Sequence, residues 1–255
     1  MADLATIIGY GSLLSETSAR STFGHHVKNF RFGRVHNYRR VFAHPASIFF
    51  QRGIANYDTQ EFASLSAEPS IGSSFTVSAF EIPTSQLPDF YDREEEFSIE
   101  SISFHDTKGG AVSTGLMCCR WSDAAYIATR GQDTFDRRYK AYGLDTIWGY
   151  NASSGILPCR VYLRHCILAV QKLGEVGCSV ATSTSSDDCG VGCIRRLCSE
   201  YVSRRPQNDD PDVSGGKPYH HDHGTAAASC RALQRLIQRH QLRFSRRFQQ
   251  AAAGC

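Results

Sequence analysis

Apolar and β-branched residues alternate with polar residues in several short runs between residues 5 and 121, which is the pattern of half-buried strands. The first run contains Thr6, Ile7 and Ile8 and ends at two glycines that bracket a tyrosine. A longer run follows over Phe32–Ala43. Short connections between such runs predict an antiparallel sheet that curls into a barrel. The remaining strand candidates are Phe75–Ile82, Phe97–Phe104 and Val112–Trp121.

Helical signals flank these strands. Ser15–Phe23 is predicted as a short helix with Ser15 or Thr17 as its N-cap, and a second short helix is predicted between Pro83 and Arg93. Ser122 is a candidate N-cap for a third helical stretch. The pattern as a whole therefore predicts an α+β fold, an antiparallel β-barrel with flanking helices.

The clearest helix prediction covers Pro158–Leu173. Proline lies near its start and Gly174 lies just past its end, which is the usual asymmetry of helix termini. Residues at three- and four-residue spacing share one face, which we expect to pack on the sheet. That face carries Tyr162, Cys166, Ala169 and Leu173.

The composition changes near residue 175. The chain has 255 residues and is 41% apolar, enough for one domain and a tail. Residues 1–174 are expected to form that domain. Residues 175–255 are rich in Ser, Asp, Cys and His, lack strand alternation, and are expected to be a divergent, largely disordered tail.

Charge and targeting signals narrow the classes of partner. The net charge is only +3, which argues against a dedicated nucleic-acid surface. No apolar run approaches the roughly 20 residues that span a bilayer, and the first residues lack the pattern of a secretory signal. We therefore expect a cytoplasmic protein without membrane or nucleic-acid partners, whose ten cysteines are mostly reduced. The sequence leaves the oligomeric state open.

The first candidate for chemistry is the Gly-Tyr-Gly-Ser turn after the first strand, Gly9–Ser12. Glycine permits a positive φ there and lets other groups approach the backbone closely. Consecutive backbone N–H groups in such a turn can bind an anion or a developing oxyanion. An ordinary glycine turn after a strand accounts for the same residues, because short glycine motifs are common.

The second candidate is the acidic segment between Asp92 and Phe97, with three consecutive glutamates. Such a run is usually a solvated face. Here, however, it joins a predicted helix to a predicted strand and is flanked by Phe90, Tyr91 and Phe97. A poorly hydrated carboxyl group beside aromatic rings has a raised pKa, as a general acid or base near neutral pH requires.

These features occur together in one known family. The strand that ends in Tyr10-Gly11-Ser12-Leu13, the long strand over Phe32–Phe42 and the Arg93-Glu94 step before Phe97 resemble the gamma-glutamylcyclotransferase-like family. The resemblance covers roughly residues 5–121. It implies a small mixed fold with a compact β-barrel, and it makes residues 1–174 a catalytic domain.

The resemblance also implies an activity. Members of that family cleave gamma-glutamyl compounds by cyclisation, in which the α-amine of the substrate attacks its own γ-carbonyl and releases 5-oxoproline and an amine. No metal, cofactor or enzyme nucleophile is implied; the expected partner is a small gamma-glutamyl substrate. Glu94 would be the general acid/base. The gamma-glutamyl moiety would be bound by Tyr10, Gly11, Ser12 and Leu13.

Departures from the family pattern leave alternatives open. Glu96 and Phe97 stand where many members have glycine and then tyrosine. A shift of one residue would make Glu95 the base instead of Glu94. The leaving amine, whether of glutathione, a gamma-glutamyl amino acid or a gamma-glutamyl amine, is not determined by the sequence. A non-catalytic member that binds a gamma-glutamyl-like ligand is the main alternative, and an interaction protein that acts through its tail is a weaker one.

Two other arrangements match known sites poorly. Ser12 could act with a histidine as in serine hydrolases, but the Gly-x-Ser-x-Gly elbow is missing. The cysteines and histidines of the tail do not follow the spacing of a zinc site, so no metal site is expected. The histidines in question are His25, His26 and His36 for the first arrangement; the second comprises Cys189, Cys193, Cys198, His220, His221 and His223.

Overall fold

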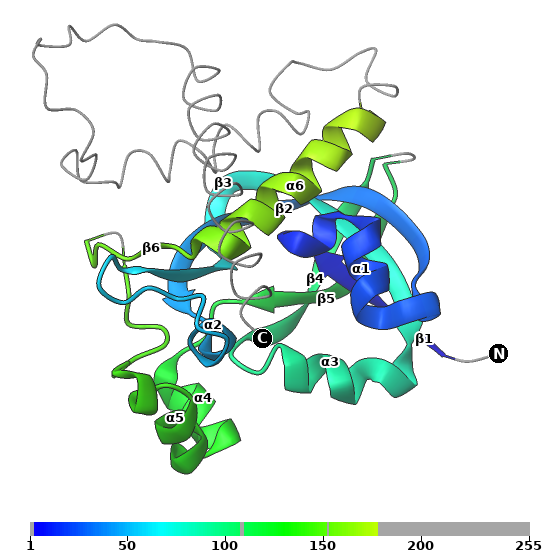
Figure 1. Ribbon diagram of the computed structural model, residues 1–255. Coiled ribbons are helices and arrows are strands. Elements are labelled where there is room, and N and C mark those ends of the chain that lie inside the picture. Colours follow the sequence, from blue (N-terminus) through cyan, green and yellow to red (C-terminus); the bar gives the residue numbers. More distant parts are fainter. Residues whose placement is uncertain (1–2, 108–109, 152, 178–255) are drawn as a thin grey trace, which may run out of the picture.

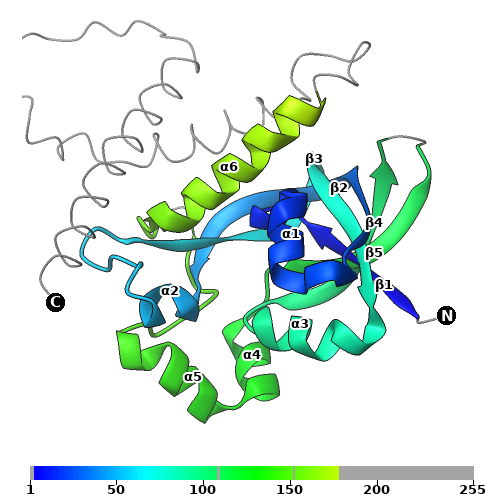
Figure 2. The ribbon, with the colours of Figure 1, turned by 45° about the vertical axis from the view of Figure 1, so that its right-hand side comes forward.

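Five strands of the computed structural model close into a barrel, shown from two sides in Figures 1 and 2. The structure describes residues 3–107, 110–151 and 153–177. Of the expected tail, residues 178–255 lie outside these residues. The strands follow one another around the barrel in the order β1, β5, β4, β2 and β3, and β3 pairs again with β1. Their bounds are β1 Leu4–Gly9, β2 Lys28–Pro45, β3 Glu61–Pro83, β4 Ser98–Asp106 and β5 Val112–Cys119.

The barrel is mixed. β1 runs parallel to β5 and antiparallel to β3, while β2 pairs antiparallel with both β3 and β4. The predicted α+β fold with a mixed barrel is therefore confirmed. A short strand, β6 (Leu157–Pro158), adds to β3 in parallel outside the closed ring.

The two longest strands bend around the barrel. The pairing of β2 with β3 shifts register at three places, and Asn29 and Asn37 lie at two of them with φ of 48° and 59°. Asparagine tolerates this left-handed conformation, and an irregular register bends a strand. β3 begins at Glu61, far before the predicted start at Phe75. The missed part is rich in Ser and also contains two Ala, which are weak strand formers on their own, and it is held in the sheet by pairing with β2.

Figure 1 shows the helices Glu16–Phe23 and Leu87–Arg93 against the outside of the barrel, and the helices Asp123–Arg130 and Gln132–Arg138 together to one side of it. The predicted Ser15 N-cap position is confirmed for α1, as is the short helix that ends at Arg93. Ser122 caps α4, because its Oγ accepts a hydrogen bond from the backbone N–H of Ala125 at 3.2 Å. The sequence pattern does not predict α2 or α5, which have only five and seven residues. The bounds are α1 Glu16–Phe23, α2 Ser47–Gln51, α3 Leu87–Arg93, α4 Asp123–Arg130 and α5 Gln132–Arg138.

Helix α6 (Arg160–Gly177) differs from its prediction at both ends. Pro158 belongs to β6 rather than to the first helical turn, and proline is tolerated there because the strand is short and lies at an edge. The helix also continues through Gly174. A single glycine costs only about 1 kcal/mol in a helix, and good helix formers surround it here.

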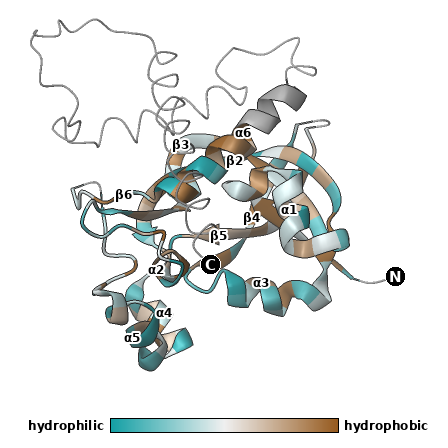
Figure 3. Ribbon diagram, in the orientation of Figure 1, coloured by the Kyte–Doolittle hydropathy of each residue, from teal (hydrophilic) through white to brown (hydrophobic). Residues whose placement is uncertain are grey.

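The predicted inner face of α6 does pack on the barrel. Cys166 and Ala169 are buried, and the Tyr162 ring lies 5.3 Å from the Phe49 ring. The side chain of Leu173 lies outside the described residues. In Figure 3 the apolar colour concentrates on the strands and on the part of α6 against them. Among the described residues, no helix is long and apolar enough to cross a membrane.

Candidate active site

The turn that follows β1 is fixed by three other strands. Ser78 of β3 donates a hydrogen bond from its Oγ to the carbonyl of Leu13 at 2.7 Å. Arg40 of β2 donates from Nη1 to the carbonyl of Tyr10 at 3.2 Å. The hydroxyl of Tyr10 donates to the carbonyl of Cys118 in β5 at 2.6 Å. The turn is therefore a rigid part of the barrel end rather than a loose connection.

Close approach explains both glycines of the turn. A Cβ atom on Gly9 would lie 2.6 Å from Leu13 Cβ and 2.7 Å from Ser78 Oγ. A Cβ atom on Gly11 would lie 2.7 Å from the hydroxyl oxygen of Tyr162, at the start of α6. Gly11 has φ −113°, so the expectation of a positive φ is not met at this residue. Here glycine is needed for space.

The three glutamates after α3 have different surroundings. Glu95 and Glu96 are buried, with 4% and 8% of their surface exposed. The side chain of Glu94 is 18% exposed, and its Oε1 lies 3.1 Å from the Nε of Arg93. The solvated-face interpretation is therefore wrong for this segment, and each carboxyl group can be assigned its own contacts.

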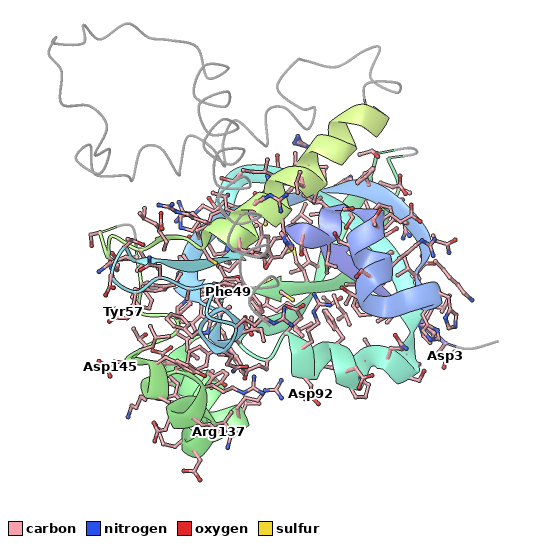
Figure 4. The ribbon with its side chains drawn as sticks, viewed as in Figure 1. Asp3, Phe49, Tyr57, Asp92, Arg137 and Asp145 are labelled. Atoms are coloured by element: carbon pink, nitrogen blue, oxygen red, sulfur yellow. The ribbon has the colours of Figure 1, made fainter. Side chains whose placement is uncertain are left out.

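Glu95 is held by two buried tyrosines and an arginine. The hydroxyl of Tyr126 donates to Glu95 Oε2, and the hydroxyl of Tyr139 donates to Oε1 at 3.4 Å. Arg138 of α5 forms an ion pair with Oε1 at 3.0 Å. Both carboxylate oxygens are thus engaged, and they tie the end of α3 to α4 and α5. Figure 4 shows the same junction, with Asp92 labelled at the end of α3 and Arg137 on α5.

Glu96 faces His44 of β2. Glu96 Oε1 lies 4.0 Å from His44 Nε2, too far for a hydrogen bond, and the imidazole stacks on the Trp148 ring at 4.4 Å. Burial raises the pKa of Glu96 well above its usual value, and the charges of Glu94 and Glu95 raise it further. Burial also lowers the pKa of His44 to about 3, with Arg120 adding to the effect. Although the distance would permit an ion pair, both shifts favour a neutral acid beside a neutral imidazole.

The buried imidazole should make the fold sensitive to acid. With a folded pKa of about 3 against 6.5 unfolded, His44 binds a proton more readily in the unfolded chain. Its contribution to stability is complete above pH 6.5 and is lost as the pH falls toward 3, by up to about 1.4 kcal/mol per pH unit. In urea unfolding measured from pH 4 to 7, the free energy of unfolding should change less steeply with pH in His44→Phe than in wild type. His165 is exposed on α6, and the control His165→Gln should leave this pH dependence unchanged. The same pH dependence in His44→Phe as in wild type would show that His44 is not a buried neutral imidazole.

Glu94 lies within electrostatic reach of the turn. Burial raises the pKa of Glu94, and the neighbouring Arg93 guanidinium opposes that rise. Burial raises the pKa of Tyr10, Tyr162 and Cys118, and the negative charge of Glu94 raises each of them further. The acidic segment, the turn, β5 and the first turn of α6 therefore meet in one region.

The predicted binding residues Tyr10–Leu13 differ in how far they are exposed, and the side chain of Tyr10 is not placed to face a ligand. Ser12 and Leu13 are partly exposed, whereas Gly11 is buried. Tyr10 is buried and directs its hydroxyl to Cys118, so its side chain belongs to the core.

Sequence reasoning missed the partners that hold these residues. They lie far apart along the chain and have no motif in common; only Tyr162 carries a signal, its helical spacing with Cys166. The missed residues are Arg40, His44, Ser78, Tyr126, Arg138, Tyr139 and Tyr162.

The described part of the chain contains neither a Ser12–histidine pair for a serine hydrolase nor a cluster of metal ligands. There, no hydrogen bond joins Ser12 to a histidine; His25 and His26 lie against each other at 4.0 Å, and His36 lies 5.0 Å from His105. Among the residues that the structure describes, no group of three His, Cys, Asp or Glu side chains is placed to hold a metal ion. The cysteine and histidine candidates of the tail fall outside them.

No family model matches the chain, and no curated protein matches it. Among solved structures, a gamma-glutamyl cyclotransferase aligns over 76% of this chain and 99% of its own, with 10% identity and a TM-score of 0.42. A glutathione-specific gamma-glutamyl cyclotransferase from yeast aligns over 81% and 99%, with 11% identity and a TM-score of 0.44. An uncharacterized protein from Homo sapiens aligns over 72% and 90%, with 12% identity and a TM-score of 0.43. Two of these three structures are named as gamma-glutamyl cyclotransferases.

Proposed function

We propose that this chain is a gamma-glutamylcyclotransferase that releases 5-oxoproline from a small gamma-glutamyl compound. The observation that carries the proposal is a poorly hydrated carboxyl group, that of Glu94, whose charge acts on Tyr10 of the rigid Tyr10–Leu13 turn. A base with a raised pKa can take a proton near neutral pH and return it in a later step. Every residue of the proposed site lies before residue 174, so we assign the activity to residues 1–174.

In the proposed reaction, the Glu94 carboxylate takes a proton from the α-ammonium group of the substrate. The neutral amine then attacks the γ-carbonyl carbon, and a C–N bond closes the five-membered ring. Glu94 gives its proton to the nitrogen of the leaving amine as the original amide C–N bond breaks. A second proton from the attacking nitrogen follows the same route, so both protons end on the released amine.

The turn would bind the gamma-glutamyl moiety through its backbone. The leading N–H groups of a helical turn have no acceptor within that turn, and here these belong to Ser12 and Leu13 at the start of the 3-10 turn Ser12–Leu14. With Gly11 they would face the substrate and polarise its oxygen atoms. Tyr10 would contribute by anchoring the turn, because its hydroxyl is already bonded to Cys118.

The test is an assay of 5-oxoproline released by the full chain. Three substrates, namely glutathione, a gamma-glutamyl amino acid and a gamma-glutamyl amine, would identify the leaving group. We expect turnover of at least one of them without added metal or cofactor. Binding of a gamma-glutamyl ligand without any release of 5-oxoproline would contradict the proposal and favour the non-catalytic alternative.

Arg93 should determine the pH at which kcat/KM falls on the acidic side of its pH profile. The reaction needs ionised Glu94, so kcat/KM should fall as the pH drops through the pKa of that group. The Arg93 guanidinium holds this pKa below the value that burial alone would give. Arg93→Gln should therefore move the limb to higher pH, while Arg93→Lys, which keeps the charge, should move it less. A limb at the same pH in all three proteins would contradict the assignment of the base.

A further inference from the structure

We propose that the hydroxyl of Tyr162 donates a hydrogen bond to the γ-carbonyl oxygen of the substrate and stabilises the oxyanion that forms there. The inference rests on the proposed function and adds a catalytic residue to it. Its basis is the position of that hydroxyl, which lies against Gly11 of the turn.

The position of the hydroxyl is well fixed. Tyr162 lies in the first turn of α6, and its ring packs against Phe49 at 5.3 Å and against Phe42 at 6.5 Å between ring centroids. Its oxygen would be 2.7 Å from a Cβ atom on Gly11. A donor that is already held in place needs no reorganisation when charge develops, which is the condition for effective oxyanion stabilisation.

The hydroxyl also keeps its proton. Burial raises the pKa of Tyr162 well above its usual value. The Cys166 thiol, through its charge and a side-chain hydrogen bond with the hydroxyl, and the Glu94 carboxylate raise it further. The group is therefore a neutral donor throughout the working pH range. Tyr10 is less suited to this role, because its hydroxyl donates to a backbone carbonyl at 2.6 Å. The partner of Tyr162 is the Cys166 thiol, a weak acceptor that a substrate oxygen can replace.

The charges around Tyr162 favour a carbonyl ligand over a carboxylate. A substrate carboxylate bound there would be repelled by the nearby charge of Glu94. The substrate's α-carboxylate is better matched to Arg93, whose side chain is 44% exposed at the edge of the site. This leaves the γ-carbonyl oxygen, which is uncharged until the amine attacks, as the acceptor for Tyr162.

The first experiment is the variant Tyr162→Phe in the full chain, assayed for 5-oxoproline release. Loss of one oxyanion donor should lower kcat about 100-fold with KM within about threefold of wild type. Tyr150→Phe is the matched control, because that tyrosine packs on the same core and should leave kcat unchanged. A kcat within threefold of wild type, or a loss confined to KM, would overturn the inference.

A second experiment tests the position of the hydroxyl without any activity. Gly11→Ala should lower Tm by roughly 5 °C, because its Cβ would overlap the Tyr162 oxygen. Adding Tyr162→Phe removes that oxygen and should restore part of the loss. Equal losses with and without the oxygen would show that the hydroxyl does not lie over Gly11.

Binding of 5-oxoproline separates this inference from the proposed function, because its lactam oxygen is the former γ-carbonyl oxygen. If the wild-type chain turns over none of the three substrates, the proposed function fails. The contact still stands if calorimetry finds 5-oxoproline bound three- to tenfold more weakly by Tyr162→Phe than by wild type. Equal affinity of the two proteins, or no binding by either, would refute the contact as well.

Discussion

Glu94→Gln should reduce 5-oxoproline release by a factor of 10² to 10⁴ and leave the fold intact, because a general base contributes about that much to rate. Glutamine keeps the shape of the side chain but cannot accept the proton of the α-ammonium group. Burial already disfavours the charged form of Glu94, so an uncharged replacement should cost little stability. The measurements are kcat with the best substrate and the free energy of unfolding in urea.

The neighbouring glutamates provide the control for this prediction. Glu96 is already favoured in its neutral form, so Glu96→Gln should retain most of the activity. If Glu94→Gln remained active while Glu95→Gln was inactive but fully folded, the acid/base would be Glu95. That result would also require Glu95 to leave the tyrosine and arginine contacts that occupy it.

The second large effect is expected on stability rather than on chemistry. Glu95→Leu should lower the free energy of unfolding by about 2–3 kcal/mol, because it leaves two buried hydroxyls and Arg138 without their acceptor. The estimate stays below the cost of a fully buried pair because the Arg138 side chain is 37% exposed and can reach water. For a domain of this size the loss corresponds to a fall in Tm of roughly 2–4 °C per kcal/mol.

Two further variants, Glu95→Gln and Glu100→Gln, serve as comparisons for the stability of Glu95→Leu. The amide in Glu95→Gln can still accept from a tyrosine hydroxyl, so its loss should be smaller than that of leucine. Glu100 is exposed on β4, and Glu100→Gln should change stability by less than about 0.5 kcal/mol. A Glu95→Leu protein as stable as Glu100→Gln would show that Glu95 does not anchor α4 and α5 to the end of α3.

The sequence allowed the barrel to be predicted because alternation and turn residues report strands directly. It placed β1, β4 and β5 well, since their β-branched and aromatic residues are locally distinctive. The first half of β3 was beyond such reasoning, because its Ser- and Ala-rich residues are held in the sheet by pairing with distant segments, chiefly β2. The end of α6 was misjudged for a related reason, as one glycine is a weak stop signal.

For the site, the sequence located the two segments but not their surroundings. Tyr10–Leu13 and Glu94 are recognisable as motifs, and the structure brings them within electrostatic reach of each other. The different surroundings of Glu94, Glu95 and Glu96 could not be predicted from three identical residues in a row. They depend on contacts with Arg93, Tyr126 and His44, respectively. Those contacts arise from the tertiary fold, which local spacing does not report.

The way the first strand closes the ring has a consequence for how the protein is made. β1 leaves the ribosome first, yet its partners are residues 78–83 and 116–117. Until those have been synthesised, the backbone N–H and C=O groups of β1 have no strand to pair with, and the turn behind it lacks Ser78 and Cys118. Long-range closure of this kind is slow. The growing chain therefore carries β1 without its partners for much of its synthesis, and the ring closes only after β5 has emerged.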